Sequence, residues 1–569
     1  MGKIIGIDLG TTTSEIAYLK NGKPEIIINK DGDRITPSVV AFNKENEIIV
    51  GKKAKRQMAG RQVKEVKRLM GTSEKIFLGE KEFLPQQISA IILKYLKECA
   101  EEFLGEEVVE AVITVPAKFD NLQRQATKDA AEIAGLKVER LINEPTAAAL
   151  AYGLENIGKE EKVLVYDLGG GTFDVSILEM FEGVLEVRAS RGNNRLGGKD
   201  FDERLMNYIF DEFYRKHEID LRKNAFAVQA VKEAAENAKI ELSHSEYTDI
   251  IIPFIPSVMN FDGSPIGIDM SITRKQFEMM IADLVESTDD IINEALKASG
   301  LTDEDIDVVL AVGGSTRVPC VKKLLRNRFG SKLKHDINPD EVVALGAAVQ
   351  AGIKYGLFDS ENEILTTTTC SHSLGISTVV YMGGGFVPGV FDILIPIDST
   401  IPVTKKNIYQ TVHDYQEIVK IEVFEGEETL TSLNTKIGEF ELEGIPPAPA
   451  GEQSIEVAFS YDINSILQVD ATILSTGKKI TKIFNLKSMS LEEIEDAKAD
   501  LDKAWKDSIF SQRCKIIIEV AEKKIPALPQ AEKVKVENLL NKLKMAITEG
   551  DEELIEKYDT ELTDLLFEL

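Results

Sequence analysis

Two short stretches of the sequence combine an aspartate, a glycine-rich turn and a threonine, which together suit phosphate chemistry. Asp8 follows the apolar run Ile4–Ile7 and precedes Gly10-Thr11-Thr12, and Asp167 precedes Gly169-Gly170-Gly171-Thr172. Glycine lets backbone N–H groups approach a polyphosphate closely, and carboxylates hold a divalent cation and its waters. Each turn alone also fits a tight β-hairpin. Together they predict two opposed turns that grip a nucleoside triphosphate and Mg²⁺.

Further candidates for nucleotide binding lie later in the chain. The segment Val312–Arg317 ends a strand-like run in Gly-Gly and could let the backbone approach an adenosine, although an ordinary strand–helix turn also fits. Glu236, Lys239 and Ser243 have i, i+3, i+7 spacing, which places them on one face of a helix. A salt-bridged surface helix would show the same spacing. The sequence Gly197–Asp200 lacks the upstream glycine and the Ser or Thr of a phosphate-binding P-loop, so that fold is disfavoured.

These residues need elements that position them, and residues 1–360 alternate strand-like and helix-like segments in the α/β pattern. Strands are expected at 112–115 and 163–166, and a helix at 122–134. The unit around Asp8 recurs around Asp167 as strand, aspartate, glycine turn, threonine and a second strand. The repeat predicts a duplicated fold whose halves face each other across a cleft.

The remainder of the chain changes character twice. Residues 361–371 read as an interdomain linker, and the β-prone run Thr366–Thr369 predicts that it can pair as a strand. Residues 372–488 alternate apolar and polar side chains between Gly- and Pro-rich turns, which indicates an antiparallel β-sandwich. Residues 489–569 are expected to be helical: Ser490 and Glu493 form a capping box ahead of a helix to about Lys524, and two more helices follow, one ending near Gly550 and one over 552–567.

Composition excludes several classes of function. The 569 residues carry a formal net charge of −28, which repels nucleic-acid backbones and anionic membranes. No run of 18 apolar residues and no secretory signal is visible, so we expect neither a membrane span nor export. The four cysteines are far apart and form no C-x-x-C pair, which favours a reducing cytoplasm over disulfides or a zinc site.

Seven segments of the chain carry a specific resemblance. They are Gly6–Thr12, Asn29–Ser38, Ala111–Ala117, Arg124–Asp129, Ile142–Ala149, Val165–Asp174 and Ala311–Arg317. Over nearly its whole length the sequence resembles the heat-shock protein 70 (DnaK-type) chaperone family, and its short lid and unusual β domain are closer to the specialised bacterial HscC-like branch. The resemblance implies a multidomain chain with an actin-like ATPase domain of duplicated RNase H-like halves (1–360), a linker (361–371), a β-sandwich peptide-binding domain (372–488) and a short α-helical lid (489–569).

The resemblance also implies roles for individual residues at a site for ATP or ADP, Mg²⁺ and K⁺. Asp8 and Asp167 would hold the metal ions, Lys67 would orient the attacking water, and Glu144, Thr172 and Asp174 would complete the catalytic group. Lys67 also fits a solvated lysine, and Glu144 a first-turn helix acid. The nucleotide itself would contact Gly10, Thr11, Thr12, Gly169, Gly170, Gly171, Gly197, Gly198, Glu236, Lys239, Ser243, Gly313, Gly314, Ser315, Arg317 and Asp340.

In the β domain the family threads an extended peptide through a groove. The matching positions here are Ile376, Thr378, Tyr409, Val412, Val419, Ile421 and Ile466, although periodicity alone assigns most of them to the sandwich core. Residues 380–391 appear as an insertion that we expect to form a loop beside the groove. The resemblance implies unfolded polypeptide clients, J-domain co-chaperones and a nucleotide-exchange factor as partners.

Three functional hypotheses follow from the sequence. The first is an ATPase chaperone whose affinity for apolar extended peptides is cycled by ATP binding and hydrolysis. The second is a small-molecule kinase on the same duplicated fold, which leaves residues 372–569 without a role. The third is a binding module that takes up ATP without turning it over, and the set Asp8, Lys67, Glu144, Asp167 and Thr172 argues against it.

Overall fold

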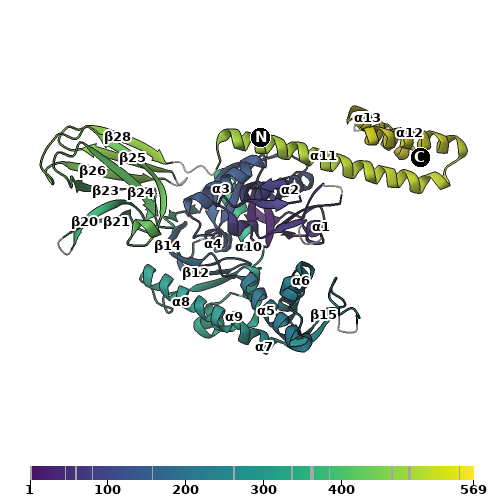
Figure 1. Ribbon diagram of the computed structural model, residues 1–569, viewed down its shortest axis with the longest axis horizontal. Helices are drawn as coiled ribbons and strands as arrows, with labels where there is room; N and C mark the ends of the chain where they lie inside the picture. The colour runs from purple at the N-terminus through teal and green to yellow at the C-terminus, as the bar shows by residue number, and fades with distance from the viewer. Residues whose placement is uncertain are drawn as a thin grey trace.

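The structure is a computed structural model that describes residues 3–569 apart from 45–46, 58–60, 80, 157, 260–262, 335–336, 359–363, 383–384, 463–465, 485–488 and 550–551. Figure 1 shows a central α/β body, a β-rich part at one end, and a long helix that runs from the β-rich part along the body to a small helical bundle.

The first half of the α/β body is built on a sheet of order β11-β10-β1-β2-β3, with β4 paired to β2. Its strands are β1 (Lys3–Leu9), β2 (Thr13–Lys20), β3 (Lys23–Ile26), β4 (Thr36–Pro37), β10 (Val108–Val115) and β11 (Lys137–Asn143). Helices α2 (Pro85–Leu104), α3 (Asn121–Ile133), α4 (Glu144–Glu155) and α10 (Val342–Lys354) pack around it. Ile5, Gly6 and Ile7 of β1 are buried and Ile4 is half-buried, because helices cover both faces of the sheet.

The second half repeats the plan with the sheet order β17-β12-β13-β14-β18. Its strands are β12 (Glu161–Leu168), β13 (Phe173–Phe181), β14 (Val184–Asn193), β17 (Val308–Val312) and β18 (Leu365–Thr366), and its helices are α5 (Gly198–His217), α6 (Ala225–Leu242), α7 (Arg274–Met280), α8 (Ala282–Ser299) and α9 (Pro319–Phe329). The antiparallel pair β1/β2 has β10 as a parallel neighbour, and β12/β13 has β17. The duplication predicted from Asp8 and Asp167 is therefore present in the strand topology.

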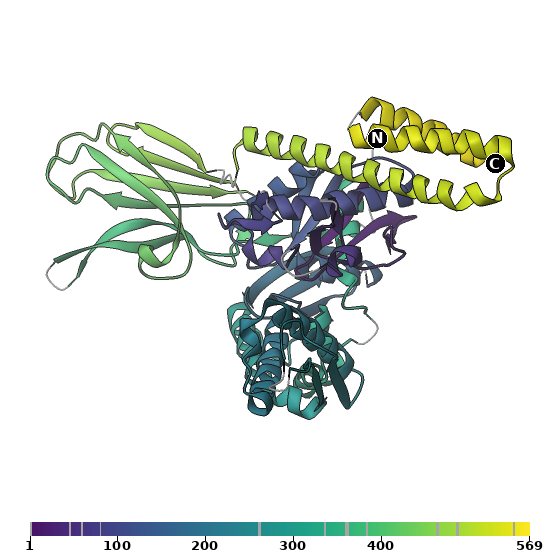
Figure 2. The same cartoon turned by 45° about the vertical axis from the view of Figure 1, so that its right-hand side comes forward.

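Smaller elements complete the two halves. They are β5 (Val39–Phe42), β6 (Ile48–Val50), α1 (Lys52–Lys55), β7 (Gln62–Lys64), the 3₁₀ helix η1 (Val66–Leu69), β8 (Ile76–Leu78), β9 (Lys81–Phe83), η2 (Leu221–Lys223), β15 (Tyr247–Ile252), β16 (Ile268–Thr273), η3 (Gly314–Arg317) and η4 (Gly330–Lys332). Figure 2 shows α1 and α2 on one half and α5 to α7 on the other.

The β-rich part consists of two four-stranded antiparallel sheets, ordered β21-β20-β24-β25 and β23-β26-β27-β28. The bounds are β19 (Thr368–Thr369), β20 (Leu374–Met382), β21 (Gly385–Ile395), β22 (Thr400–Ile401), β23 (Val403–Gln410), β24 (Ile418–Glu425), η5 (Thr431–Leu433), β25 (Thr435–Glu443), β26 (Ser454–Tyr461), β27 (Leu467–Ile473) and β28 (Lys479–Phe484). Alternate side chains such as Val457, Phe459 and Val469 fill the space between the sheets, as the period-2 pattern predicts. The expected loop at 380–391 is wrong, because its described residues extend β20 and β21 as a hairpin.

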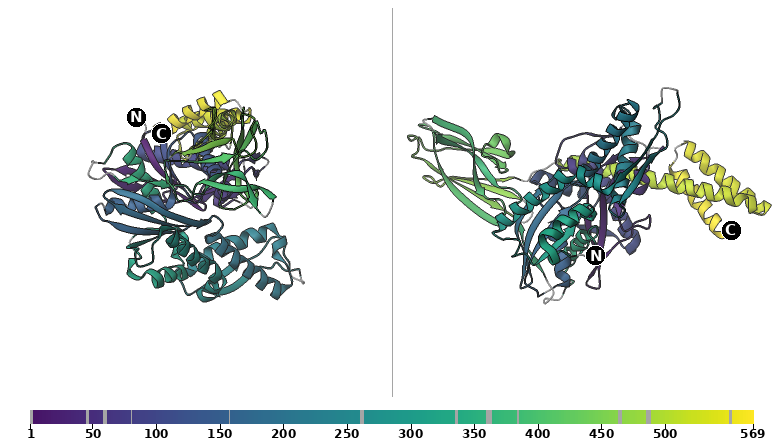
Figure 3. Two further views of the ribbon diagram at one scale, coloured as in Figure 1. Left: turned by 90° about the vertical axis from the view of Figure 1, so that its left-hand side faces the viewer. Right: turned by 90° about the horizontal axis from the view of Figure 1, so that it is seen from below.

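The C-terminal helices match their predicted positions closely. Helix α11 (Leu491–Lys524) begins at Ser490, whose side chain accepts from the Glu493 amide, and η6 (Ile525–Ala527), α12 (Gln530–Glu549) and α13 (Glu552–Glu568) follow. The first turns of α11 pack against the first half of the body, and α12 and α13 form the bundle beyond it, at the opposite end from the sandwich (Figure 3). None of the helices in the described part of the chain has the length and apolar character needed to cross a bilayer.

The predicted linker pairs with a strand of the body at its first end and with a strand of the sandwich at its second. Leu365 and Thr366 pair in parallel with Val184 and Leu185, and β19 pairs with β22 at the base of the sandwich. The strand pairing expected from the threonine run is thus confirmed. Just before it, the side chain of Ile364 is 7% exposed and packs beside Gly153 and Met180. The connection between the body and the sandwich is therefore held by backbone pairing and one apolar anchor.

Candidate functional site

The candidate site is a cleft between the two halves of the body, formed by two adjoining cavities of about 340 and 70 Å³. Both cavities are lined by the glycine turns of the two halves, including Thr11, Thr12, Gly170 and Gly314. The smaller cavity extends toward the carboxylates at the strand ends, and the larger one toward α6. The position of the turns follows from the fold, since β1 and β12 both end at this cleft.

The smaller cavity brings together the residues predicted for metal and phosphate chemistry. Asp8, Lys67, Glu144, Asp167 and Thr172 all line it. Asp8 accepts a hydrogen bond from Thr114 at 2.6 Å, which fixes its carboxylate at the end of β1. The arrangement suits an oxyanion that arrives with a cation, because carboxylates alone would repel it.

Lys67 lies in η1 and is buried, so it is not the solvated lysine that sequence also allowed. Its ammonium group forms an ion pair with Glu144, the first residue of α4. Burial lowers the pKa of Lys67, but the charges of Glu144 and Asp8 outweigh it and hold the pKa above its ordinary value. Lys67 therefore presents a permanent positive charge to the smaller cavity.

Asp167 and Asp174 face each other across the β12/β13 pair. Burial, with the nearby Glu144 charge, raises the pKa of Asp174 to about 7, and burial also raises that of Asp167 well above its usual value. Neither carboxylate oxygen of Asp174 has a hydrogen-bond partner within the protein. Lys67 and Lys118 offset this burial only in part, and the carboxylates that line the smaller cavity, on Asp8, Glu144 and Asp167, fit Mg²⁺ bound through carboxylates and water. Among the described residues no group of three or more His, Cys, Asp or Glu could hold a metal alone, so phosphate oxygens and waters would complete its coordination.

The glycine turns are shaped so that larger residues cannot replace them. A Cβ on Gly10 would lie 2.1 Å from the Thr13 carbonyl oxygen, and one on Gly170 would lie 1.9 Å from the Thr12 hydroxyl. The second contact crosses the cleft, so Gly170 permits the two turns to approach each other. Arg68 strengthens the same junction by donating to the Gly171 carbonyl at 2.7 Å and pairing with Asp200.

The larger cavity contains the residues predicted for the adenosine. Lys239 of α6 donates to Asp202 at 2.9 Å and Ser315 donates to the Gly169 carbonyl at 2.8 Å. The remaining lining residues of this group are Glu236, which pairs with Lys55, Ser243, and Arg317, which pairs with Asp340. Polar groups on apolar walls of this size suit a nucleoside.

Four predicted residues lie outside the cavity walls. Gly171, Gly197, Gly198 and Asp174 line neither cavity. Gly197 and Gly198 support the wall from behind, since the Gly198 amide donates to Gly169 and a Cβ on Gly197 would lie 2.5 Å from the Gly171 nitrogen. Gly313, Gly314 and Asp340, by contrast, line the smaller cavity.

Sequence reasoning missed several residues that line the cleft or support its turns, namely Glu15, Ser38, Lys55, Arg68 and Thr114. Glu15 carried a weak signal, because it is a charged residue directly before the apolar pair Ile16-Ala17 of its strand. The others come from a loop, another strand and the short helices α1 and η1, and nothing in local spacing links them to the cleft.

The predicted peptide-groove residues lie in both sheets of the sandwich. Ile376 and Ile421 are buried in its core, and Tyr409 and Val419 pack against that core. The Tyr409 hydroxyl donates to Asp392 at 2.5 Å, which gives this polar group a half-buried partner. Thr378 donates to the Val390 carbonyl, whereas Val412 and Ile466 are half-buried near strand ends. Their role as a groove stays a prediction.

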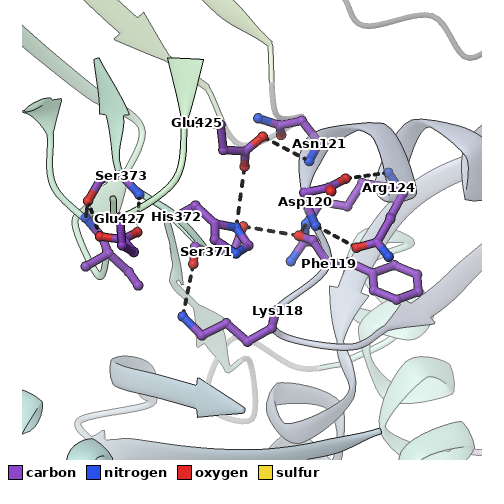
Figure 4. A network of polar contacts seen from close by, with 12 residues as sticks. Lys118, Phe119, Asp120, Asn121, Arg124, Ser371, His372, Ser373, Glu425 and Glu427 are labelled. Atoms are coloured by element: carbon purple, nitrogen blue, oxygen red, sulfur yellow. Dashed lines mark hydrogen bonds and ion pairs between the residues drawn. The ribbon is translucent and has the colours of Figure 1, made fainter. Parts of the chain in front are cut away.

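A polar network joins the sandwich to the body (Figure 4). Lys118 donates to the Ser371 carbonyl at 3.0 Å, and the Asn121 amide donates to Glu425 at 3.4 Å. Tyr461 of the sandwich donates to the Asn121 side chain at 2.6 Å. Lys118 and Asn121 lie before and at the start of α3, in the short segment that follows the end of β10 at Val115, so the network lies close in sequence to the candidate nucleotide site.

The fold and cleft thus define a two-halved nucleotide-binding protein joined to a β-sandwich and a helical segment. A family model described as Hsp70 protein matches residues 4–77 and 73–568. The chain is 47% identical over 565 residues to the Chaperone protein DnaK of Thermotoga neapolitana, which covers 96% of this chain and 93% of that relative. The corresponding proteins of Thermotoga maritima and Thermosipho africanus are 46% and 45% identical with the same coverage. The chain belongs to the Hsp70 family.

Membership sets the general character of the site. Proteins of the Hsp70 family are ATP-driven chaperones that bind ATP and ADP, generally with Mg²⁺. The relatives given above carry the DnaK name, and the assignment to an HscC-like branch stays a prediction.

Proposed function

We propose that this chain is an ATP-dependent chaperone in which the cleft hydrolyses ATP and the β-sandwich binds extended apolar peptide. The observation that carries the proposal is the convergence of Asp8, Lys67, Glu144, Asp167 and Thr172 on one small cavity between two glycine turns. Within it Asp8 and Asp167 would hold Mg²⁺ and K⁺. Mg²⁺ would offset the charge of the triphosphate.

Side chains and backbone groups of the protein would supply the remaining contacts to the phosphates and to the attacking water. Lys67, fixed by Glu144, supplies a cation beside the phosphates and orients a water, and the turns at Gly10–Thr12 and Gly169–Gly171 donate backbone N–H groups. Thr172, which is 9% exposed in the wall of the cavity, offers a hydroxyl to the same water or to the terminal phosphate.

Coupling between the cleft and the sandwich would use the interface described above. The linker pairs with β14, the sandwich contacts the start of α3, and α11 lies on the body. This arrangement supports a state in which the helical lid is away from the sandwich. Hydrolysis would release these contacts and let the lid close over bound peptide. Such coupling between two sites needs two arrangements of one interface. The domain limits 1–360, 361–371, 372–488 and 489–569, the J-domain and exchange-factor partners, and a cytoplasmic location belong to the same proposal.

The test is release of a fluorescent apolar peptide. ATP should accelerate its dissociation from the full chain, and the peptide should in turn stimulate phosphate release. Thr172→Ala should lower hydrolysis about 10²-fold, as for loss of a donor at a reacting centre, while ATP still releases peptide. Phosphate release that requires a sugar or carboxylate acceptor would instead establish a kinase, and ATP binding without turnover would establish a binding module.

A further inference from the structure

His372 lies where the linker, the sandwich and the body meet. Figure 4 shows it between Glu425 of β24 and residues 118–120 of the body. Its Nδ1 atom is 3.5 Å from a carboxylate oxygen of Glu425, and its side chain is 25% exposed. Histidine is the residue type whose charge ordinarily changes between pH 5 and pH 8, so a histidine at an interface between domains can make that interface respond to pH.

Glu425 is the buried carboxylate of this junction, with a side chain that is 4% exposed. It accepts a hydrogen bond from the Asn121 amide at 3.4 Å, which is long for such a bond, and among the described residues Nδ1 of His372 has no hydrogen-bond partner. A buried carboxylate with weak partners is costly unless a positive charge lies beside it. The imidazolium form of His372 has an N–H on both nitrogens and supplies that charge.

Docking of the sandwich on the body adds a second carboxylate, on Asp120. Asp120 caps α3 by accepting from the Gln123 amide at 2.8 Å. Burial raises the pKa of Asp120, the Gln123 hydrogen bond lowers it, and the charge of Glu425 raises it again, so the net change is a rise that the charge of His372 offsets in part. The docked arrangement therefore holds two carboxylates that repel each other, and a positive ring attracts both. In separated domains, water would screen the same charges.

Two other cations lie at this junction, and neither responds as histidine does. The ammonium group of Lys118 donates to the Ser371 carbonyl at 3.0 Å, and burial lowers its pKa. Arg124 of α3 donates to the Phe119 carbonyl at 3.1 Å and to the Asn143 side chain at 2.8 Å. Arg124 carries its charge at every physiological pH, so it attracts the two carboxylates equally in acid and at neutral pH.

The remaining titratable neighbours have other partners or no charge. Asp398 forms an ion pair with Arg191 at 2.7 Å, and Glu427 accepts from the backbone and hydroxyl of one serine at 2.7 and 2.8 Å. Burial raises the pKa of the Cys370 thiol to about 12, so the thiol stays uncharged. The Tyr461 hydroxyl donates to the body as an O–H. The imidazole is therefore the group best placed to change the charge of this junction near neutral pH.

We propose that protonation of His372 strengthens the docking of the sandwich on the body, which makes the contact between the two domains dependent on pH. By linkage, a contact that favours the protonated ring strengthens as the pH falls through the titration range of histidine and weakens as the pH rises. Asp120 acts in the same direction, because its raised pKa means that the docked state favours its neutral form. The lowered pKa of Lys118 acts in the opposite direction, so variants of His372 are needed to isolate the ring.

The functional consequence rests on the proposed function. If the docked arrangement is the one that releases peptide, a fall in pH from 8 to 6 should accelerate ATP-driven peptide release. Docking itself can be measured without any peptide, so the two statements are tested separately.

Hydrogen exchange of the Asn121 amide, which is bonded to Glu425, measures docking in the full chain with a bound non-hydrolysable ATP analogue. The protection factor is the intrinsic exchange rate divided by the observed rate, and it removes the pH dependence of the exchange chemistry. Protection should be about fivefold higher at pH 6 than at pH 8, the size expected for one ion pair near the surface.

Three variants isolate the histidine. His372→Gln should show equal protection at pH 6 and pH 8. His372→Lys, whose charge persists at both values, should show at pH 8 the protection that the wild type shows at pH 6. His413→Gln, at an exposed histidine of the same sandwich, is the control and should keep the wild-type pH dependence.

Equal protection of the wild type at the two pH values overturns the role of His372. Wild-type pH dependence in His372→Gln overturns it as well, and so does loss of protection at both values in His372→Lys. Protection that depends on pH as expected, with peptide release that does not, leaves the role of His372 intact and contradicts the proposed function instead. Equal urea unfolding midpoints for the wild type and the variants would verify that each variant is folded.

Discussion

At the scale of single residues, the burial of charged side chains determines the electrostatics of the cleft. Lys67 keeps its charge because Glu144 and Asp8 surround it, whereas burial raises the pKa of Asp167 and Asp174 and favours their neutral forms. This balance makes the site sensitive to pH and suits it to a cation. The functional consequence is that nucleotide and metal should stabilise the body strongly, since they supply the missing positive charge.

Asp174→Asn should flatten the pH dependence of stability in the nucleotide-free protein. Burial raises the pKa of Asp174 to about 7 from 3.8, so the folded state keeps a proton that the unfolded chain releases. The stability that this proton contributes is complete below about pH 4 and is lost as the pH rises through 7. The free energy of unfolding should therefore fall by roughly 3 kcal/mol between pH 5 and pH 8. Urea unfolding at pH 5 and at pH 8 measures this difference in the free energy of unfolding. Asp305→Asn, at an exposed residue, is the control, and equal pH slopes for wild type and Asp174→Asn would contradict the prediction.

At the scale of elements, strand β18 of the linker forms hydrogen bonds with both halves of the body. The Leu365 amide donates to Gly183 at 2.8 Å and the Thr367 amide to Leu185 at 3.0 Å. Arg140 of β11 donates to the Thr366 hydroxyl at 2.9 Å and to Gln350 at 3.0 Å. The threonine hydroxyls therefore give the linker polar attachments in addition to its backbone pairing.

Arg140→Ala should loosen the linker without altering the cleft. Hydrogen bonds from a charged group are worth about 1.5–3 kcal/mol, so exchange of the Leu365 and Thr367 amides should accelerate roughly 10- to 100-fold. Hydrogen exchange with bound ATP analogue measures this, and nucleotide affinity should stay the same. Arg188→Ala, on the neighbouring strand β14, removes a side chain whose ion pairs among the described residues are with Glu179 and Glu186, and should leave exchange unchanged. Unchanged protection in Arg140→Ala would show that backbone pairing alone holds the linker.

At the scale of the whole molecule, the sandwich and helix α11 both contact the first half of the body. Helix α11 places Trp505 against α2, where its indole N–H donates to Glu98, and Lys94 pairs with Asp502. Trp505 is 7% exposed and is the only tryptophan of the chain. It therefore reports directly on whether the lid lies on the body.

Exchange of ATP analogue for ADP should shift the fluorescence of Trp505 to longer wavelength and raise its quenching by acrylamide several-fold, if hydrolysis releases the lid. Lys94→Ala should lower the population of the docked lid and move the ATP-state signal toward that with ADP. Lys97→Ala, on the same helix but paired within it to Glu101, is the control. Trp505 fluorescence that is the same with ATP analogue and with ADP would contradict coupling between the cleft and the lid.

Features that depend on local pattern could be predicted from the order of amino acids alone. The Ser490 cap, the alternation within residues 372–488 and the repeated Asp-Gly-Thr units depend on residues close in sequence, so periodicity and turn chemistry were sufficient to place them. Tertiary structure decided which side chains meet. Glu15 becomes part of the cleft because β1 and β2 set it opposite Asp8, and Lys118 and Asn121 become interface residues because the sandwich docks there. Such contacts join residues up to hundreds of positions apart, and their energies depend on burial and on neighbouring charges, which exist only once the chain is folded.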